Sequence, residues 1–212
     1  MIEYDAVIPA GGRGSRLGGV DKSALVVAGV SLADRALASV AGARRVVFVG
    51  HGVELSSEPD PRVGVARESP RWSGPVASLA AGLAAIEESA PYTVVLAADL
   101  PSAAPAVQRL LALAGRAGTT GAPGEGLVAV AGGGIRQPLL GVYRSDRLRA
   151  AVSAVVGAES RTDGRGGSMR AVLERMPLQE VEMPEAWCRD IDTPADAADF
   201  GVTLPTRSDD HG

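Results

Sequence analysis

The sequence predicts an α/β protein of three layers, in which helices cover both faces of a mainly parallel sheet. Short apolar runs with β-branched residues alternate with alanine- and leucine-rich stretches at helical spacing along the 212 residues. Such alternation is typical of strands joined by crossover helices. The chain is 46% hydrophobic and 22% charged, a balance that allows one domain with a large core. We expect that domain to span residues 1–203, followed by a disordered polar tail at 204–212.

Each predicted element follows from a run of residues of one kind. The apolar runs predict strands at residues 6–9, 45–49, 63–66, 93–97, 127–130, 139–143 and 180–183. The alanine- and leucine-rich stretches predict helices at residues 31–40, 75–88, 104–117, 146–156 and 169–175. Two glycine-rich stretches interrupt this order, and we expect a loop at 118–126 and a mobile flap at 157–167.

Charge and cysteine content exclude several classes of partner and site. The net charge of −4 gives no general attraction for nucleic acid or for an anionic membrane, so neither is expected as a partner. The single cysteine, Cys188, excludes an intramolecular disulfide and a multi-cysteine metal site, and we expect it to be a small buried side chain. The sequence has no leader-like segment and no apolar run of about 18 residues, which predicts a cytoplasmic protein.

The first candidate site is a glycine-rich loop between the first predicted strand and the first predicted helix. It contains three glycines and three cations: Gly11, Gly12, Gly14, Arg13, Arg16 and Lys22. Glycines let backbone N–H groups turn toward a phosphate, and nearby cations neutralise the charge of a phosphate chain. The loop is not a P-loop, because Asp21 and not Gly precedes Lys22, and it misses the last glycine of a Rossmann fingerprint by one position. The alternative is a flexible surface loop with solvated arginines.

The second candidate site is an acid at the end of a buried strand. Asp99 follows the strand predicted at 93–97, and parallel strands present their carboxyl ends to the ligand crevice. A carboxylate there suits Mg²⁺ bound to phosphate oxygens, although Asp99 could instead cap the turn before Pro101. Asp192 lies on an extended segment just before a predicted helix start at Thr193, and it is a weaker candidate for a second metal contact.

Five segments, in the same order, resemble the molybdenum cofactor guanylyltransferase family. They are residues 10–22, 73–79, 99–101, 137–144 and 190–196. The family's loop usually opens Leu-Ala-Gly-Gly, whereas here Pro9 replaces the leucine and removes one backbone N–H. The family often has an acid several residues before its Gly-Pro segment, which is Gly74 and Pro75 here. The role of that acid would fall to Glu68 or be lost in this chain.

The resemblance implies a fold, a reaction and a set of site residues. The fold would be a Rossmann-like nucleotidyltransferase fold, similar to that of A-type glycosyltransferases. The reaction would be Mg²⁺-dependent transfer of GMP from GTP to molybdopterin, giving molybdopterin guanine dinucleotide and pyrophosphate. Catalysis would depend on Lys22, Arg16 and Asp99, with Asp99 and, more weakly, Asp192 as metal ligands. The nucleotide-binding residues would be Pro9, Ala10, Gly11, Gly12, Arg13, Gly14, Ser15, Arg16, Lys22, Glu68, Gly74, Pro75 and Asp99. Molybdoenzyme maturation proteins are further partners to consider.

Alternatives stay open at the level of the sequence. A cytidylyltransferase for the same cofactor, or a nucleotidyltransferase for a sugar or lactyl phosphate, would share the glycine loop and the strand-end acid. The choice of base depends on hydrogen bonds that the sequence does not place. A non-catalytic carrier of nucleotide or pterin would need no metal-bound leaving group, and Lys22 together with Asp99 argues against it. We expect Trp72 to pack against the protein rather than to cover a base ring.

Overall fold

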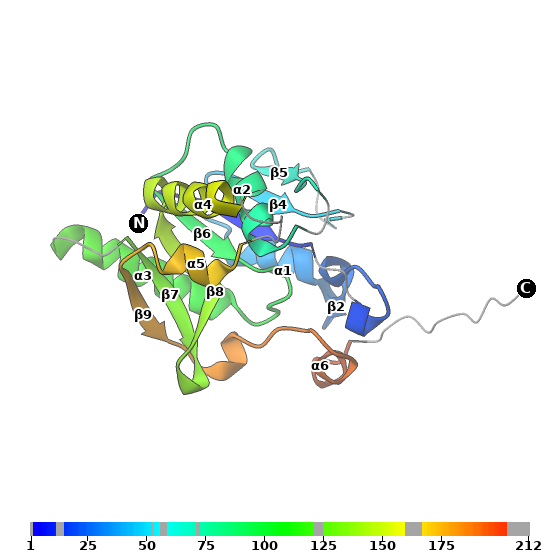
Figure 1. The fold of residues 1–212 in the computed structure, drawn as a ribbon. Coiled ribbons are helices and arrows are strands. Elements are labelled where there is room, and N and C mark those ends of the chain that lie inside the picture. Colours follow the sequence, from blue (N-terminus) through cyan, green and yellow to red (C-terminus); the bar gives the residue numbers. More distant parts are fainter. Residues whose placement is uncertain are drawn as a thin grey trace, which may run out of the picture.

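A seven-stranded sheet forms the centre of the computed structural model (Figure 1). The strands lie in the order β5-β4-β1-β6-β8-β7-β9. Their bounds are β1 (Tyr4–Pro9), β4 (Val46–Val49), β5 (Val63–Ala66), β6 (Tyr92–Leu96), β7 (Gly126–Ala131), β8 (Ile135–Arg144) and β9 (Leu178–Glu182). Neighbours run parallel except at β8, which is antiparallel to both β6 and β7. The predicted mainly parallel sheet is confirmed.

The structure describes residues 2–11, 15–51, 53–55, 59–70, 73–120, 125–159 and 167–202. The predictions made for Gly12, Arg13, Gly14 and Trp72 lie outside this part, as does the side chain of Ser15. Most of the predicted flap and the whole of the predicted tail lie outside it too.

Helices cover both faces of the sheet, as predicted. One face carries α1 (Leu32–Ser39) and α3 (Ala104–Thr120), and the other carries α2 (Pro75–Ala84), α4 (Ser145–Glu159) and α5 (Met169–Leu173). In the central strand β1, Ala6 and Ile8 belong to one core cluster and Val7 to the other, and all three are 0% exposed. A strand covered on both faces is mostly apolar, which explains the apolar run of residues 6–9 in β1.

One predicted helix is too long, and the reason lies in the chain that follows it. α2 ends at Ala84 and not at residue 88. The residues beyond it bond to other elements, because the Ala90 N–H donates to the buried carboxylate of Asp5 at 2.6 Å. The carbonyl of Glu88 accepts a hydrogen bond from Arg44. These contacts draw the chain away from the helix axis.

The glycine-rich stretches are less irregular than predicted. Residues 118–120 complete α3 and Gly126 begins β7, so the stretch at 118–126 is not a loop throughout. Gly126 is needed because a Cβ at that position would come within 2.8 Å of the Val142 carbonyl on the neighbouring strand. Likewise, α4 continues to Glu159, inside the stretch predicted as a flap. The strand predicted at 139–143 is also longer, because β8 begins at Ile135.

A smaller apolar cluster joins the two ends of the chain beside the sheet, and we call it the terminal cluster. It consists of Leu17, Leu25, Val27, Leu32, Ile191, Ala197 and Val202. Its elements are η1 (Ser15–Leu17), η2 (Lys22–Ala24), the hairpin of β2 (Val26–Val27) and β3 (Val30–Ser31), and α6 (Pro194–Asp199). Figure 1 shows α6 next to β2, although these elements come from opposite ends of the sequence.

Three short features complete the described part of the chain. The turns η3 (Gly132–Gly134) and η4 (Glu185–Trp187) lie between β7 and β8 and after β9. Cys188 is buried at 6% exposure, as expected. None of the described helices has the length and apolar character that crossing a membrane would require.

Candidate functional site

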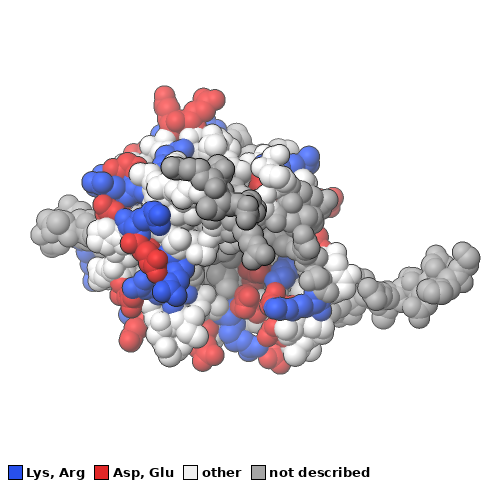
Figure 2. Space-filling model, viewed as in Figure 1, with Lys and Arg blue, Asp and Glu red and all other residues white. Residues whose placement is uncertain are grey.

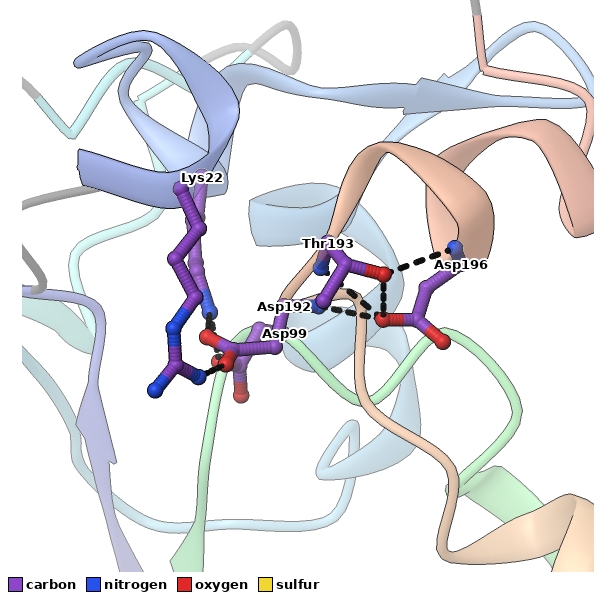
Figure 3. A network of polar contacts seen from close by, with 6 residues as sticks. Lys22, Asp99, Asp192, Thr193 and Asp196 are labelled. Atoms are coloured by element: carbon purple, nitrogen blue, oxygen red, sulfur yellow. Dashed lines mark hydrogen bonds and ion pairs between the residues drawn. The ribbon is translucent and has the colours of Figure 1, made fainter.

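Lys22 lies between two carboxylates at the carboxyl edge of the sheet (Figure 3). Its Nζ is 3.1 Å from Oδ2 of Asp99 and 2.8 Å from Oδ1 of Asp192. Arg16 also forms an ion pair with Asp192. We call Arg16, Lys22, Asp99 and Asp192 the charge cluster. The structure therefore brings together all three residues predicted as catalytic and both predicted as metal ligands.

Local structure places each member of the charge cluster. Asp99 follows β6, a central strand of the sheet. Asp21 caps η2 by accepting hydrogen bonds from the N–H and the hydroxyl of Ser23, which fixes the start of the turn that carries Lys22. Asp192 stands just before the capping box that Thr193 forms with Asp196 at the start of α6 (Figure 3). The cap of η2 and the end of β6 thus place Lys22 and Asp99 next to each other.

The contacts shift the pKa values of Lys22 and Asp192. Burial acts to lower the pKa of Lys22, but the charge of Asp99 and the hydrogen bonds to both carboxylates outweigh it, so the pKa is raised. The hydrogen bond from Lys22 lowers the pKa of Asp192, and Arg16 adds to this effect against a smaller effect of burial. At neutral pH the amine is therefore cationic and the Asp192 carboxyl is anionic. The Lys22 side chain is only 13% exposed, so water screens these charges incompletely.

A third acid stands near the charge cluster. Loss of surrounding water raises the pKa of Asp190, and the charge of Asp99 raises it further. The sequence singles out the segment around Asp190 but assigns this residue no role. Its position shows that negative charge at this edge exceeds what Lys22 alone neutralises.

The glycine loop begins at the same edge of the sheet. Ala10 is tied into the sheet, because its N–H donates to the Val49 carbonyl at 2.8 Å, so this N–H is not available to a phosphate. The carbonyl of Pro9 accepts from Ala98 at 3.0 Å. Backbone donors for an anion at this loop must therefore come from residues after Ala10.

A buried acid lines the other side of the loop. Glu68 is 8% exposed, and its Oε1 lies 3.8 Å from the position that a Cβ on Gly11 would take. Gly50 approaches the loop even more closely, since a Cβ there would come within 3.0 Å of the Gly11 nitrogen. Gly50 is absent from the predicted site. The sequence feature that could have identified Gly50 is its place directly after β4, at the edge where the glycine loop leaves β1.

The predicted Gly-Pro segment begins α2. Gly74 is the N-cap with φ at 94°, a value that favours glycine, and Pro75 occupies the first turn. Because α2 follows β5 and precedes β6, its N-terminus lies at the carboxyl edge of the sheet. No hydrogen bond between this segment and the charge cluster is found in the described part of the chain.

The donor chemistry of the charge cluster fits a magnesium ion. Mg²⁺ binds hard oxygen ligands and usually takes one or two carboxylates plus phosphate oxygens and water. Asp99 and Asp192 offer two carboxylates around a single cationic position. Groups of three or more metal-binding side chains are absent among the described residues, so a ligand would have to complete the coordination.

A cavity at the amino edge of the sheet is not this site. It has a volume of about 750 Å³ and is lined by Arg44, Arg45 and Arg62 together with Glu87 and Glu88. These residues lie at the starts of β4 and β5 and after α2, at the opposite edge from Asp99. In parallel sheets ligands bind at the carboxyl edge, so the charge cluster is the better candidate.

Sequence comparisons match the chain to one family of known proteins. The sequence model of the MobA-like NTP transferase domain matches residues 6–181. A protein described as a probable molybdenum cofactor guanylyltransferase, from Natronomonas pharaonis, is 38% identical over 111 residues. That alignment covers 48% of this chain and 52% of the relative, so the chain matches about half the length of the relative.

Solved structures show the same fold. A molybdopterin-guanine dinucleotide biosynthesis protein A from Archaeoglobus fulgidus superposes with a TM-score of 0.65 at 20% identity, covering 92% of this chain and 96% of that one. A 2-C-methyl-D-erythritol 4-phosphate cytidylyltransferase from Francisella tularensis gives 0.69 at 14% identity, covering 94% and 98%. The predicted nucleotidyltransferase fold is confirmed.

Proposed function

Because this chain belongs to the MobA-like NTP transferase domain family, we propose that it transfers GMP from GTP to molybdopterin and releases pyrophosphate. The observation that carries the proposal is the position of Lys22 between Asp99 and Asp192 beside the glycine loop. A cation and two metal-binding carboxylates at one point are what a triphosphate requires.

The chemistry asks little of the protein beyond positioning and charge. The acceptor is a phosphate monoester, which is already ionised near neutral pH, so no general base is needed. An acceptor oxygen bonds to the α-phosphorus of GTP, and the bond from that phosphorus to the bridging oxygen breaks, with the electron pair leaving on pyrophosphate. Lys22 would stabilise the charge that develops on the α-phosphate, and Arg16 the charge on the leaving pyrophosphate.

Asp99 and Asp192 would hold a Mg²⁺ ion, whose charge would draw the two anionic reactants together. For this, Lys22 and Arg16 have to release the carboxylates and pair with phosphate oxygens instead. Side-chain contacts alone hold both cations to the carboxylates, so their release would break no backbone hydrogen bond.

Glu68 favours guanine over cytosine as the base. The Watson–Crick edge of guanine carries two adjacent donors, and one carboxylate can accept from both. Cytosine offers a single amino donor beside acceptors, which a carboxylate repels. A buried acid next to Gly11 would therefore discriminate for GTP. On this proposal the product would pass to molybdoenzyme maturation proteins in the reducing cytoplasm.

The test compares pyrophosphate release from GTP, CTP and ATP, each with molybdopterin and Mg²⁺. We expect the wild-type protein to release pyrophosphate far faster from GTP than from CTP or ATP. In Glu68→Gln, the ratio of the rate with GTP to the rate with CTP should fall by about 10-fold. Faster release with CTP would favour the cytidylyltransferase alternative. Binding of GTP without any consumption would favour the carrier alternative.

A further inference from the structure

One backbone hydrogen bond joins the segments that carry the two carboxylates of the charge cluster. The N–H of Ile191 donates to the carbonyl of Asp99 at 3.1 Å. Asp192 is the next residue, so the main chains of both acids are fixed relative to each other at this point. A shift of either segment would change the distance between their side chains.

The side chain of Ile191 packs in the same cluster as residues close in sequence to Arg16 and Lys22. It is 0% exposed and lies in the terminal cluster with Leu17 and Leu25. Leu17 directly follows Arg16, and Leu25 ends the turn that carries Lys22. Ile191 therefore bonds to the backbone of Asp99, precedes Asp192, and packs in the same cluster as residues close to Arg16 and Lys22.

The segment around Ile191 is internally braced. The N–H groups of Asp192 and Thr193 donate to Oδ2 of Asp196 at 3.3 and 2.8 Å. Arg189 pairs with Asp199 at 2.7 Å. Such a segment moves as a unit, so its docking at Ile191 sets the position of Asp192. It also lies beyond residue 181, where the match to the family ends.

We propose that Ile191 is the positioning residue of the phosphate and metal end of the site, an inference that rests on the proposed function. Ile191 holds Asp99 and Asp192 at the separation that one metal ion and the phosphates require. The base end depends on a different element, because Glu68 follows the edge strand β5, whereas Asp99 follows the central strand β6. Loosening Ile191 should therefore weaken metal binding and turnover while leaving recognition of the base unchanged.

The test compares Ile191→Ala with Ile86→Ala. Ile86 is 5% exposed and lies after α2 in a different core cluster, so the control removes the same atoms far from the site. Mn²⁺ binding is followed by electron paramagnetic resonance with a non-hydrolysable GTP analogue present. We expect Ile191→Ala to weaken Mn²⁺ binding and to lower kcat, each by about 10-fold or more, with KM for GTP changed by less than about 3-fold. Ile86→Ala should change none of these values by more than about 2-fold.

Rescue and hydrogen exchange separate positioning from stability. Ile191→Val keeps most of the buried volume and should restore Mn²⁺ binding to within about 3-fold of the wild type. Amides of residues 97–100 should exchange faster in Ile191→Ala than in Ile86→Ala, a readout that needs no substrate. Equal effects of the two alanine variants on Mn²⁺ binding and exchange would overturn the proposal. If the wild-type protein binds no nucleotide, the proposed function fails, and the exchange comparison still decides the role of Ile191.

Discussion

Lys22 lies between Asp99 and Asp192, within hydrogen-bond distance of both carboxylates. It is the only lysine in the sequence, and every other cationic side chain of this class is arginine. A compact ammonium fits between two carboxylates, whereas a planar guanidinium presents a wider fork. On the proposed function, the amine would compete with a metal ion for the same oxygens.

This competition predicts that loss of the Lys22 charge changes metal affinity and turnover in opposite directions. In Lys22→Gln, the carboxylates lose their cation, so the affinity for Mn²⁺ without nucleotide should rise by about 10-fold. Turnover should fall by at least about 100-fold, because the charge on the α-phosphate is no longer stabilised. Mn²⁺ titration by electron paramagnetic resonance and a pyrophosphate assay measure the two effects. Weaker Mn²⁺ binding in the variant would show that Lys22 does not mask the site.

At the scale of elements, the pairing of β8 with β7 is irregular near the site. β8 pairs with β7 as Val128 with Gly141 and then, after a shift of register, as Ala129 with Gln137. The residues between them leave the β7 ladder, and the Leu139 carbonyl accepts from Ala97 at 2.8 Å instead. Because β8 is antiparallel to β6, its start lies at the edge of the sheet where β6 ends and Asp99 follows.

Tyr143 holds the irregular part of β8 in place. Its hydroxyl donates to the Pro138 carbonyl at 2.9 Å, and complete burial raises the pKa of Tyr143, so the proton stays on. We expect Tyr143→Phe to lower the free energy of unfolding by about 1–2 kcal/mol, measured by urea denaturation at pH 7. Tyr92→Phe is the control, since the Tyr92 hydroxyl has no hydrogen-bond partner within the described residues. Equal losses in both variants would contradict this role.

The start of β5 supplies a prediction on pH. Arg62 donates to Asp60 at 2.6 Å and to the Ala41 carbonyl at 2.6 Å, which fastens the turn before β5 to the chain before β4. The hydrogen bond from Arg62 lowers the pKa of Asp60. A lowered pKa in the folded state means that the pair stabilises the fold above the unfolded pKa, and that this stabilisation is lost as the pH falls through the folded pKa.

We therefore expect the urea midpoint of the wild type to fall more than that of Asp60→Asn between pH 6 and pH 3. The measurement is urea denaturation of both proteins at the two pH values. Parallel decreases would show that Asp60 contributes nothing to the acid sensitivity.

At the scale of the molecule, charges of both signs are interspersed over the visible surface (Figure 2). With a net charge of −4, the protein has no broad attraction for polyanions. On the proposed function, its affinity for a triphosphate would have to come from the local cations. Such a ligand would bridge segments from distant parts of the chain, because Lys22 and Asp192 are 170 residues apart in sequence.

A ligand that bridges these segments should raise the free energy of unfolding of the protein. GTP with Mg²⁺ at 100 times its dissociation constant should stabilise the fold by about 2.7 kcal/mol, seen as a rise in melting temperature. ATP at the same concentration should raise it less, and Asp99→Asn should lose most of the rise with GTP. A rise of the same size in Asp99→Asn would remove that carboxylate from the binding site.

Much of this architecture is predictable from sequence, because periodicity and strand-end rules are local. The approach of Lys22 to Asp99 follows from the rule that parallel strands end at one edge. The β2–β3 hairpin escapes detection because each strand has two residues, although Ala28 and Gly29 both have positive φ, as tight hairpin turns need. Gly126 looks like a loop residue because its reason, the approach of Val142, lies on another strand.

Because Lys22 is the one lysine of the sequence, its side chain can be followed by nuclear magnetic resonance. Apart from the N-terminus, Lys22 is the one site that reductive methylation with ¹³C-formaldehyde can label, so a spectrum of the labelled protein would contain a single side-chain signal. At 13% exposure this group reacts slowly, and its signal would move whenever the neighbouring carboxylates exchange it for another cation. The labelled Lys22 amine would thus report when another cation binds to Asp99 and Asp192.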